Sequence, residues 1–162
     1  MMRMLRDFLA RSAIAALFLL SLFVASHAAD LTFEKDRIRL LTTGGRAHDL
    51  TVELAIDPEQ REQGLMHRRQ LAPDHGMLFD FGETRRVMMW MRNTYLPLDM
   101  LFIGADGTVA TIHENAVPLS EAIIDSQEPV AFVLELNAGT VKRLGIRPGD
   151  RITGARIPAA AR

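Results

Sequence analysis

Apolar and polar side chains alternate along residues 48–56, with four aliphatic residues on one face of an extended chain and polar residues on the other. Residues 32–41 show a partial form of the same pattern. Such alternation is typical of strands that are buried on one side. Thr43-Gly44-Gly45, between the two segments, supplies turn residues. The pattern therefore predicts a β-hairpin at the start of the domain.

Two short helices are expected. Asp57 can accept hydrogen bonds from the free N–H groups of a first helical turn, and Pro58 suits the first helical position. This helix is expected to continue through Leu65-Met66, placing Arg61, Leu65 and Arg69 on one stripe. A second helix is expected over residues 138–144, because Gly145 provides a C-terminal cap.

The remaining pattern predicts short strands that are mostly joined by turns. They are expected over residues 77–81, 87–91, 98–103, 108–113, 130–136 and 151–153. Residues 82–84 are expected to turn the chain, and Asp106-Gly107 predicts a hairpin. The core is expected to contain Val52, Leu54, Leu78, Met89, Met91, Leu98, Phe102, Val133 and Leu134. The expected fold is mainly β (α+β), a compact single-domain antiparallel β barrel or sandwich with one or two short helices.

Residues 1–28 have the layout of a secretory signal peptide. Three arginines precede an apolar run over 13–25, and Ser26-His27-Ala28 places small residues at the −3 and −1 positions of a cleavage site. The run is shorter than the roughly 20 residues that span a bilayer. We therefore expect cleavage after Ala28, a periplasmic or secreted location, and one mature domain over 29–162 without a membrane span.

Composition narrows the chemistry. The chain has no cysteine, which excludes disulfides, cysteine nucleophiles and cysteine-ligated metal sites. Its formal net charge is −1, and only two of the cationic residues, Lys35 and Lys142, are lysines. This balance does not indicate a positively charged surface of the kind that binds nucleic acid. No cofactor motif is present, and none is expected.

Polar residues that adjoin apolar runs suggest one candidate binding cleft. Pro97 cannot donate to a sheet ladder, so the chain is expected to leave the sheet near it. An aromatic platform and hydrogen-bonding groups would then lie together beside the sheet. The candidate cleft consists of Arg61, Trp90, Asn93, Asp99 and Glu135. In the simpler interpretation, Asn93 and Asp99 only satisfy loop backbone groups.

Acidic residues allow a second interpretation. Glu53, Asp99, Glu114 and Glu135 are candidate carboxylates, and Glu135 lies between two leucines of a predicted strand. Two carboxylates in one pocket would support acid–base chemistry such as glycoside cleavage, with Asp99 and Glu135 as the pair. The alternative is that these carboxylates face solvent or that Glu135 forms a structural pair with Arg61 or Arg69, because lone strand carboxylates are usually exposed or paired.

Sulfur and imidazole ligands allow a third interpretation, copper binding. The candidates are Met66, Met77, Met88, Met89, Met91, Met100, His67, His75 and His113. Thioethers suit Cu(I), but the sequence has no repeated Met-x-x-Met or His-x-His spacing. Methionine usually fills cores, so no metal site is assigned.

An ordered set of short motifs resembles one family. It includes Gly64-Leu65-Met66, Trp90-Met91-Arg92-Asn93-Thr94, Pro97-Leu98-Asp99, Ala105-Asp106-Gly107, Glu135-Leu136-Asn137-Ala138-Gly139 and Pro148-Gly149-Asp150. The chain resembles the prokaryotic "domain of unknown function 192" family over about residues 50–155. The resemblance implies a β-rich, often exported domain and brings no catalytic residues. We therefore expect an exported non-catalytic binding module for a small polar ligand, glycan or envelope partner. The alternatives are a small hydrolase and a Met/His copper-binding protein.

Overall fold

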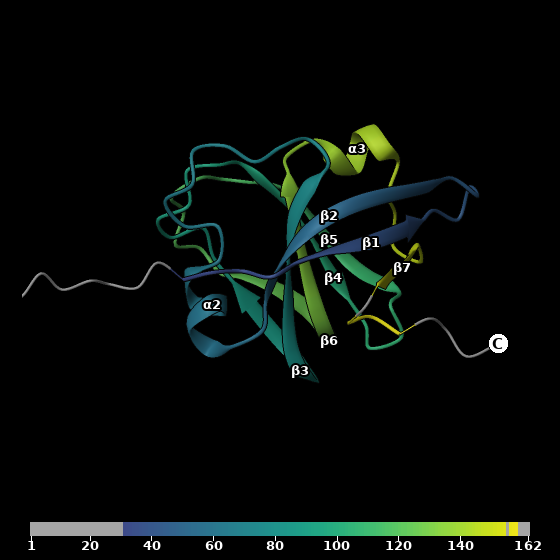
Figure 1. Ribbon diagram of the computed structural model, residues 1–162, viewed down its shortest axis with the longest axis horizontal. Helices are drawn as coiled ribbons and strands as arrows, with labels where there is room; N and C mark the ends of the chain where they lie inside the picture. The colour runs from purple at the N-terminus through teal and green to yellow at the C-terminus, as the bar shows by residue number, and fades with distance from the viewer. Residues whose placement is uncertain (1–30, 155, 159–162) are drawn as a thin grey trace, which may run out of the picture. The chain divides into compact units, whose positions relative to one another are not determined.

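Seven strands form one sheet in the computed structural model, which describes residues 31–154 and 156–158. The strands follow the spatial order β5-β4-β6-β3-β2-β1-β7. Their bounds are β1 Lys35–Leu41, β2 Ala47–Ala55, β3 His75–Met89, β4 Leu98–Ile103, β5 Val109–Ala116, β6 Ile124–Asn137 and β7 Arg151–Gly154, with helices α2 Pro58–Gln63 and α3 Thr140–Leu144 (Figure 1). The mainly β fold with two short helices is confirmed, while the predicted signal peptide lies outside the described residues.

Most neighbouring strands are antiparallel. The predicted hairpins β1–β2 and β4–β5 both form. The pair β2–β3 is parallel, with Thr51 opposite His75. Two parallel strands cannot be joined by a tight turn, and here the connection contains α2. The expectation of a purely antiparallel sheet was therefore wrong for this one pair.

The sheet curls into a half-barrel because its two edge strands meet at one end. Thr108, just before β5, forms an isolated bridge with Arg151 of β7. The N–H of Ile152 donates to the carbonyl of Gly107 at 2.8 Å. A Cβ atom at Gly107 would collide with that Ile152 carbonyl, and its φ of +85° favours glycine. A glycine at this turn thus permits the closure.

Two predicted boundaries were wrong. Helix α2 begins as expected, with Asp57 accepting from the N–H of Gln60 at 2.8 Å, but it ends at Gln63 because Gly64 takes a φ of +47°. Residues 82–84 do not end a strand. They lie within the 15-residue β3, whose register to β6 shifts between Asp80 and Arg85. An irregularity of this kind absorbs turn-forming residues without ending the strand.

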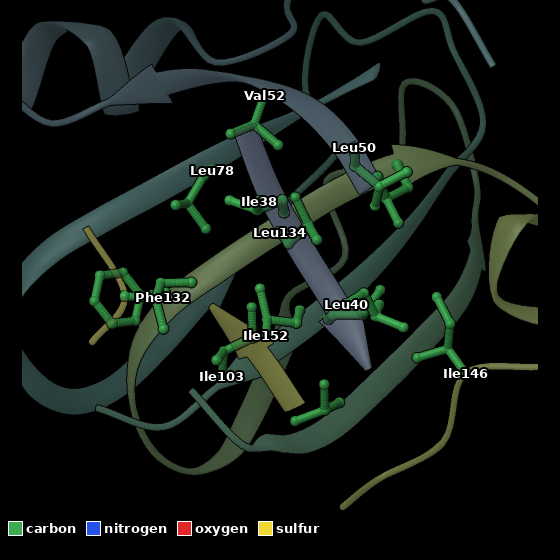
Figure 2. Close-up of a cluster of buried hydrophobic side chains, with 14 of the residues drawn as sticks. Ile38, Leu40, Leu50, Val52, Leu78, Ile103, Phe132, Leu134, Ile146 and Ile152 are labelled. Atoms are coloured by element: carbon green, nitrogen blue, oxygen red, sulfur yellow. The ribbon is translucent and has the colours of Figure 1, made fainter. Parts of the chain in front are cut away.

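Apolar side chains cover both faces of the central strands. The concave face holds one cluster, in which Ile38, Leu78, Leu134 and Ile152 pack together (Figure 2). The opposite face holds a second cluster that includes Leu65, Phe79, Met100 and Val133. Of the nine predicted core residues, eight are buried and Met89 is half-buried. Helix α3 contributes Val141 and Leu144 to the concave cluster.

Candidate functional site

Glu135 is a carboxylic acid in the middle of the second apolar cluster. It follows Leu134, which points into the concave cluster (Figure 2), and side chains alternate along a strand. On the outer face of the sheet, Glu135 is therefore placed between Met77 of β3 and Met100 of β4, its cross-strand partners. Both methionines are fully buried. The sheet thus brings Glu135 into apolar surroundings on two sides.

A pocket of about 120 Å³ opens above this carboxyl group. Its walls come from the segment 61–66 of α2 and the following loop, from β3, and from the chain just after β3. The lining residues are Arg61, Glu62, Gln63, Gly64, Leu65, Met66, Phe79, Phe81, Met88, Met89, Trp90, Thr94 and Glu135. Below, "the Glu135 pocket" means this set. Seven of these residues have aromatic, aliphatic or thioether side chains, and five have polar or charged ones.

The carboxyl group of Glu135 is almost sealed from solvent. The residue is 4 % exposed, and burial raises the pKa of its carboxyl group from 4.5 to about 8. Desolvation is the sole cause of this shift, so no neighbouring charge or hydrogen bond offsets it within the described part of the chain. The group is thus mostly protonated at neutral pH, and it can donate a hydrogen bond or, once ionised, pair with a cation.

Arg61 lines the same pocket but does not pair with Glu135. Its guanidinium group donates to the backbone carbonyls of Ile56 and Asp80, the latter at 3.0 Å, and lies over the Phe81 ring at 5.8 Å. Arg69, the other predicted partner, lies over the Tyr95 ring instead. The predicted structural pair was therefore wrong. Arg61 thereby connects α2 to β2 and β3, because Ile56 directly follows β2 and Asp80 lies within β3.

Trp90 lies at the edge of the pocket, whereas Asn93 lies outside its lining. Trp90 is 40 % exposed and stacks under the Arg92 guanidinium at 4.4 Å from the ring centre. Asn93 is exposed, with a φ of +55°, a conformation that asparagine tolerates better than most residues. Its carbonyl accepts from the N–H of His67 at 2.9 Å. Asn93 therefore joins two loops beside the pocket through its backbone carbonyl, while its side-chain amide donates to the Met66 sulfur at 3.9 Å. The simpler interpretation, in which this side chain satisfies loop backbone groups, was wrong for Asn93.

Asp99 lies on the other side of the sheet. It is opposite Leu136 of β6, one residue away from the pairing of Met100 with Glu135, so the two carboxyl groups face opposite sides. Asp99 is fully buried and accepts from the N–H of Asn115 at 3.0 Å and from the N–H of Val141 at 2.9 Å. The prediction that all five residues share one cleft was therefore wrong. The pocket brings together Arg61, Trp90 and Glu135 only.

The candidate copper ligands divide between the pocket and the core. Met66, Met88 and Met89 line the pocket, while Met77, Met91 and Met100 are buried. No histidine is among the lining residues. Across residues 31–154 and 156–158, no group of three His, Cys, Asp or Glu side chains is placed to hold a metal ion.

Several pocket residues were missed from the sequence. Phe79 and Phe81 were assigned only to a predicted strand, and Glu62 was not proposed as a site residue. Glycine is favoured at position 64, since its φ is +47° and a Cβ there would lie 3.0 Å from the Phe79 ring. The signals for this wall were two motifs of the family resemblance, Arg61-Glu62-Gln63-Gly64-Leu65-Met66 and Gly76-Met77-Leu78-Phe79, which predicted no particular geometry.

Known proteins resemble this chain over most of its length. The model of the DUF192 family, described as an uncharacterized ACR, matches residues 39–154. A crystal structure from Sinorhizobium meliloti 1021, of a protein named as a candidate transcription regulator, is 77% identical, with a TM-score of 0.77 over 78% of this chain and 98% of its own. A protein of unknown function from Novosphingobium aromaticivorans DSM 12444 is 36% identical, with a TM-score of 0.73 over 80% and 91%. The comparison with curated proteins found no match. The extent of the family match, together with these two structures, shows that this chain belongs to the DUF192 family.

Proposed function

We propose that this protein is a non-catalytic binding module and that the Glu135 pocket holds its small ligand. One observation supports this most directly: Glu135, a residue that is 4 % exposed, lines a pocket, and its carboxyl group has no partner among the described residues. A buried polar group without a partner costs folding free energy. A ligand that supplies the missing partner would recover that cost on binding.

A hydrolase based on Asp99 and Glu135 is not favoured. The two carboxyl groups face opposite sides of the sheet, and both oxygens of Asp99 accept backbone hydrogen bonds. Glu62 is the other carboxylate of the pocket lining, and its side chain is exposed on α2. Glycoside hydrolysis needs two carboxyl groups held on either side of the scissile bond. A single buried acid beside an exposed one fits ligand binding better.

Nucleic acid is not part of this proposal, although one relative is named as a candidate transcription regulator. Cations of the described residues lie beside acids in the pairs Arg39–Asp49, Arg68–Glu53, Arg86–Asp125 and Arg156–Asp80. Such paired charges leave little net positive field for a phosphate backbone. The formal net charge of −1 agrees with this.

The chain's single tryptophan makes the proposal testable, because Trp90 lines the pocket. Fluorescence titrations with short-chain amines, carboxylates, alcohols, N-acetylglucosamine and Cu(I) are expected to show a saturable change with at least one class. Isothermal titration calorimetry should give a matching stoichiometry of one. Incubation with p-nitrophenyl glycosides is expected to show no turnover. The proposal fails if no class changes the Trp90 signal at millimolar concentration, or if a glycoside is cleaved by wild type and spared by Glu135→Gln.

We further propose that the domain acts after export, in the periplasm or outside the cell. The support is the composition of residues 1–28: three arginines, a short apolar run and Ser26-His27-Ala28. Among the described residues, no helix has the length and apolar character needed to cross a membrane. Mass spectrometry of the protein expressed with its full N-terminus is expected to find Ala29 as the first residue. An intact Met1 in an envelope fraction would contradict cleavage, and a purely cytoplasmic pool would contradict export.

A further inference from the structure

The Glu135 pocket lacks one component that its chemistry calls for, a positive charge next to the buried carboxyl group. Three arginines at its walls have other partners: Arg61 donates to two backbone carbonyls, Arg85 lies over the Phe81 ring, and Arg92 lies over the Trp90 ring. We propose that the pocket binds a small organic cation, a protonated primary amine with a short apolar chain, whose ammonium group pairs with the Glu135 carboxylate. This inference rests on the proposed binding function and names the class of its ligand.

The charge of the lining supports a cation. Arg61 is the one positive residue of the set, and Glu62 and Glu135 are its two acids. With Glu135 ionised, the charges of this set sum to −1, which favours an ammonium group over a carboxylate ligand next to Glu135. Arg85 and Arg92 lie over the Phe81 and Trp90 rings and are not part of the set. An ammonium group also offers three N–H donors, and an ionised carboxyl group accepts only. The two groups are therefore matched in hydrogen bonding as well as in charge.

The walls indicate the rest of the ligand. Phe79, Met66 and Met89 present apolar or thioether surface around the carboxyl group, and Met88 at the rim is 67 % exposed. Thioether side chains adapt to the shape of an alkyl chain. An apolar cavity of about 150 Å³ accommodates benzene. The Glu135 pocket, at about 120 Å³, is therefore suited to a cation of about four to six non-hydrogen atoms.

Binding of such a cation should release a proton. Burial raises the pKa of Glu135 to about 8, so in the empty pocket the carboxyl group is protonated near neutrality. An ammonium group stabilises the ionised form and lowers this pKa again. The other titratable groups of the lining are Arg61 and Glu62 of α2, and Arg85 and Arg92 lie over the lining rings of Phe81 and Trp90. The cross-strand neighbours of Glu135 on β3 and β4 are methionines. Affinity is therefore expected to rise by up to about tenfold per pH unit from pH 6 to pH 8.

The test uses the mature chain and four probes of similar size: n-butylammonium chloride, tetramethylammonium chloride, n-butanol and sodium butyrate. Trp90 fluorescence and calorimetry in two buffers of different ionisation enthalpy measure affinity and proton release. We expect n-butylammonium to bind at least tenfold more tightly than n-butanol or butyrate, and to release close to one proton at pH 6.5. Glu135→Gln is expected to lower this affinity at least tenfold. Glu121→Gln is the matched control, because Glu121 is exposed and outside the lining, and it should leave affinity within about twofold.

Each other outcome overturns a stated part of the inference. Equal affinity for n-butanol, or tighter binding of butyrate, would show that the pocket binds ligands but does not prefer cations. The proposed binding function would then hold, and the proposed ligand class would be wrong. If tetramethylammonium, which has no N–H donor, binds as tightly as n-butylammonium, the cation does not hydrogen-bond to Glu135 and is held by contact with the aromatic rings instead. Unchanged n-butylammonium affinity in a folded Glu135→Gln protein would remove Glu135 from the site. Absence of binding by all four probes, together with the wider panel above, would remove both proposals.

Discussion

Replacing Glu135 by glutamine is expected to make the protein more stable at alkaline pH. The folded state holds the Glu135 proton up to about pH 8, whereas the unfolded chain releases it near pH 4.5. Between these values the folded state binds more protons, so the free energy of unfolding of the wild type falls as pH rises. Glutamine does not titrate. Relative to wild type, Glu135→Gln should gain on the order of 3–5 kcal/mol between pH 4.5 and pH 9.

Urea denaturation at pH 5, 7 and 9 measures this difference. Below pH 4.5 both states bind the Glu135 proton, and the two proteins should differ only by the fixed cost of the substitution. The exposed Glu121→Gln control is expected to follow the wild type at every pH. If the stability curves of wild type and Glu135→Gln stay parallel from pH 5 to pH 9, burial does not raise the pKa of Glu135. The proposal of a buried acid without a partner would then be wrong.

A substitution of Glu135 that stabilises the fold would also be informative about function. Leucine or glutamine at position 135 could lie between Met77 and Met100 without the free-energy cost of burying a carboxylate. Residues that weaken the fold are characteristic of sites whose chemistry requires them. This expected trade-off follows from the same burial of Glu135 and agrees with the proposal that the Glu135 pocket is the functional site.

Local sequence signals predicted the elements well where each element depends on its own residues. Alternation over β2 placed Leu50, Val52 and Leu54 in the core, and Asp57-Pro58 marked the start of α2. Asp106-Gly107 marked the β4–β5 hairpin, whose turn is closed by the N–H of Thr108 donating to the Asp106 carboxylate at 3.0 Å. These features follow from side-chain period, capping and turn geometry, which act over a few residues.

The candidate site depended on register between distant strands, which no local signal provides. Asp99 and Glu135 are both acids within apolar strands, yet a shift of one position in pairing decides which face each one takes. The same holds for the walls of the pocket. Arg61 meets Phe81 and the Asp80 carbonyl only because α2 connects two parallel strands. The sequence indicated that Glu135 was out of place, but it could not indicate which residues surround it.

Asp99 should prove to be a stability residue. Asp99→Asn is expected to lower the free energy of unfolding by about 2–4 kcal/mol, because one of the two buried N–H groups, of Asn115 or Val141, would face an amide NH₂ instead of a carboxylate oxygen. The N–H of Val141 belongs to the first turn of α3, and Gly139 at the N-cap offers no side chain to replace the lost acceptor. Loosening of α3 would also disturb Val141 and Leu144 in the concave cluster.

Thermal and urea denaturation of Asp99→Asn give the stability loss, and n-butylammonium titration of the folded variant gives the binding readout. Affinity should stay within about twofold of wild type, because Asp99 and the Glu135 pocket lie on opposite faces of the sheet. Asp74→Asn is the matched control: this acid is 72% exposed and 4.0 Å from Arg143 of α3, so its loss should cost less than about 0.5 kcal/mol. A fully stable Asp99→Asn protein that no longer binds the amine would reverse the assignment, making Asp99 the ligand-binding acid.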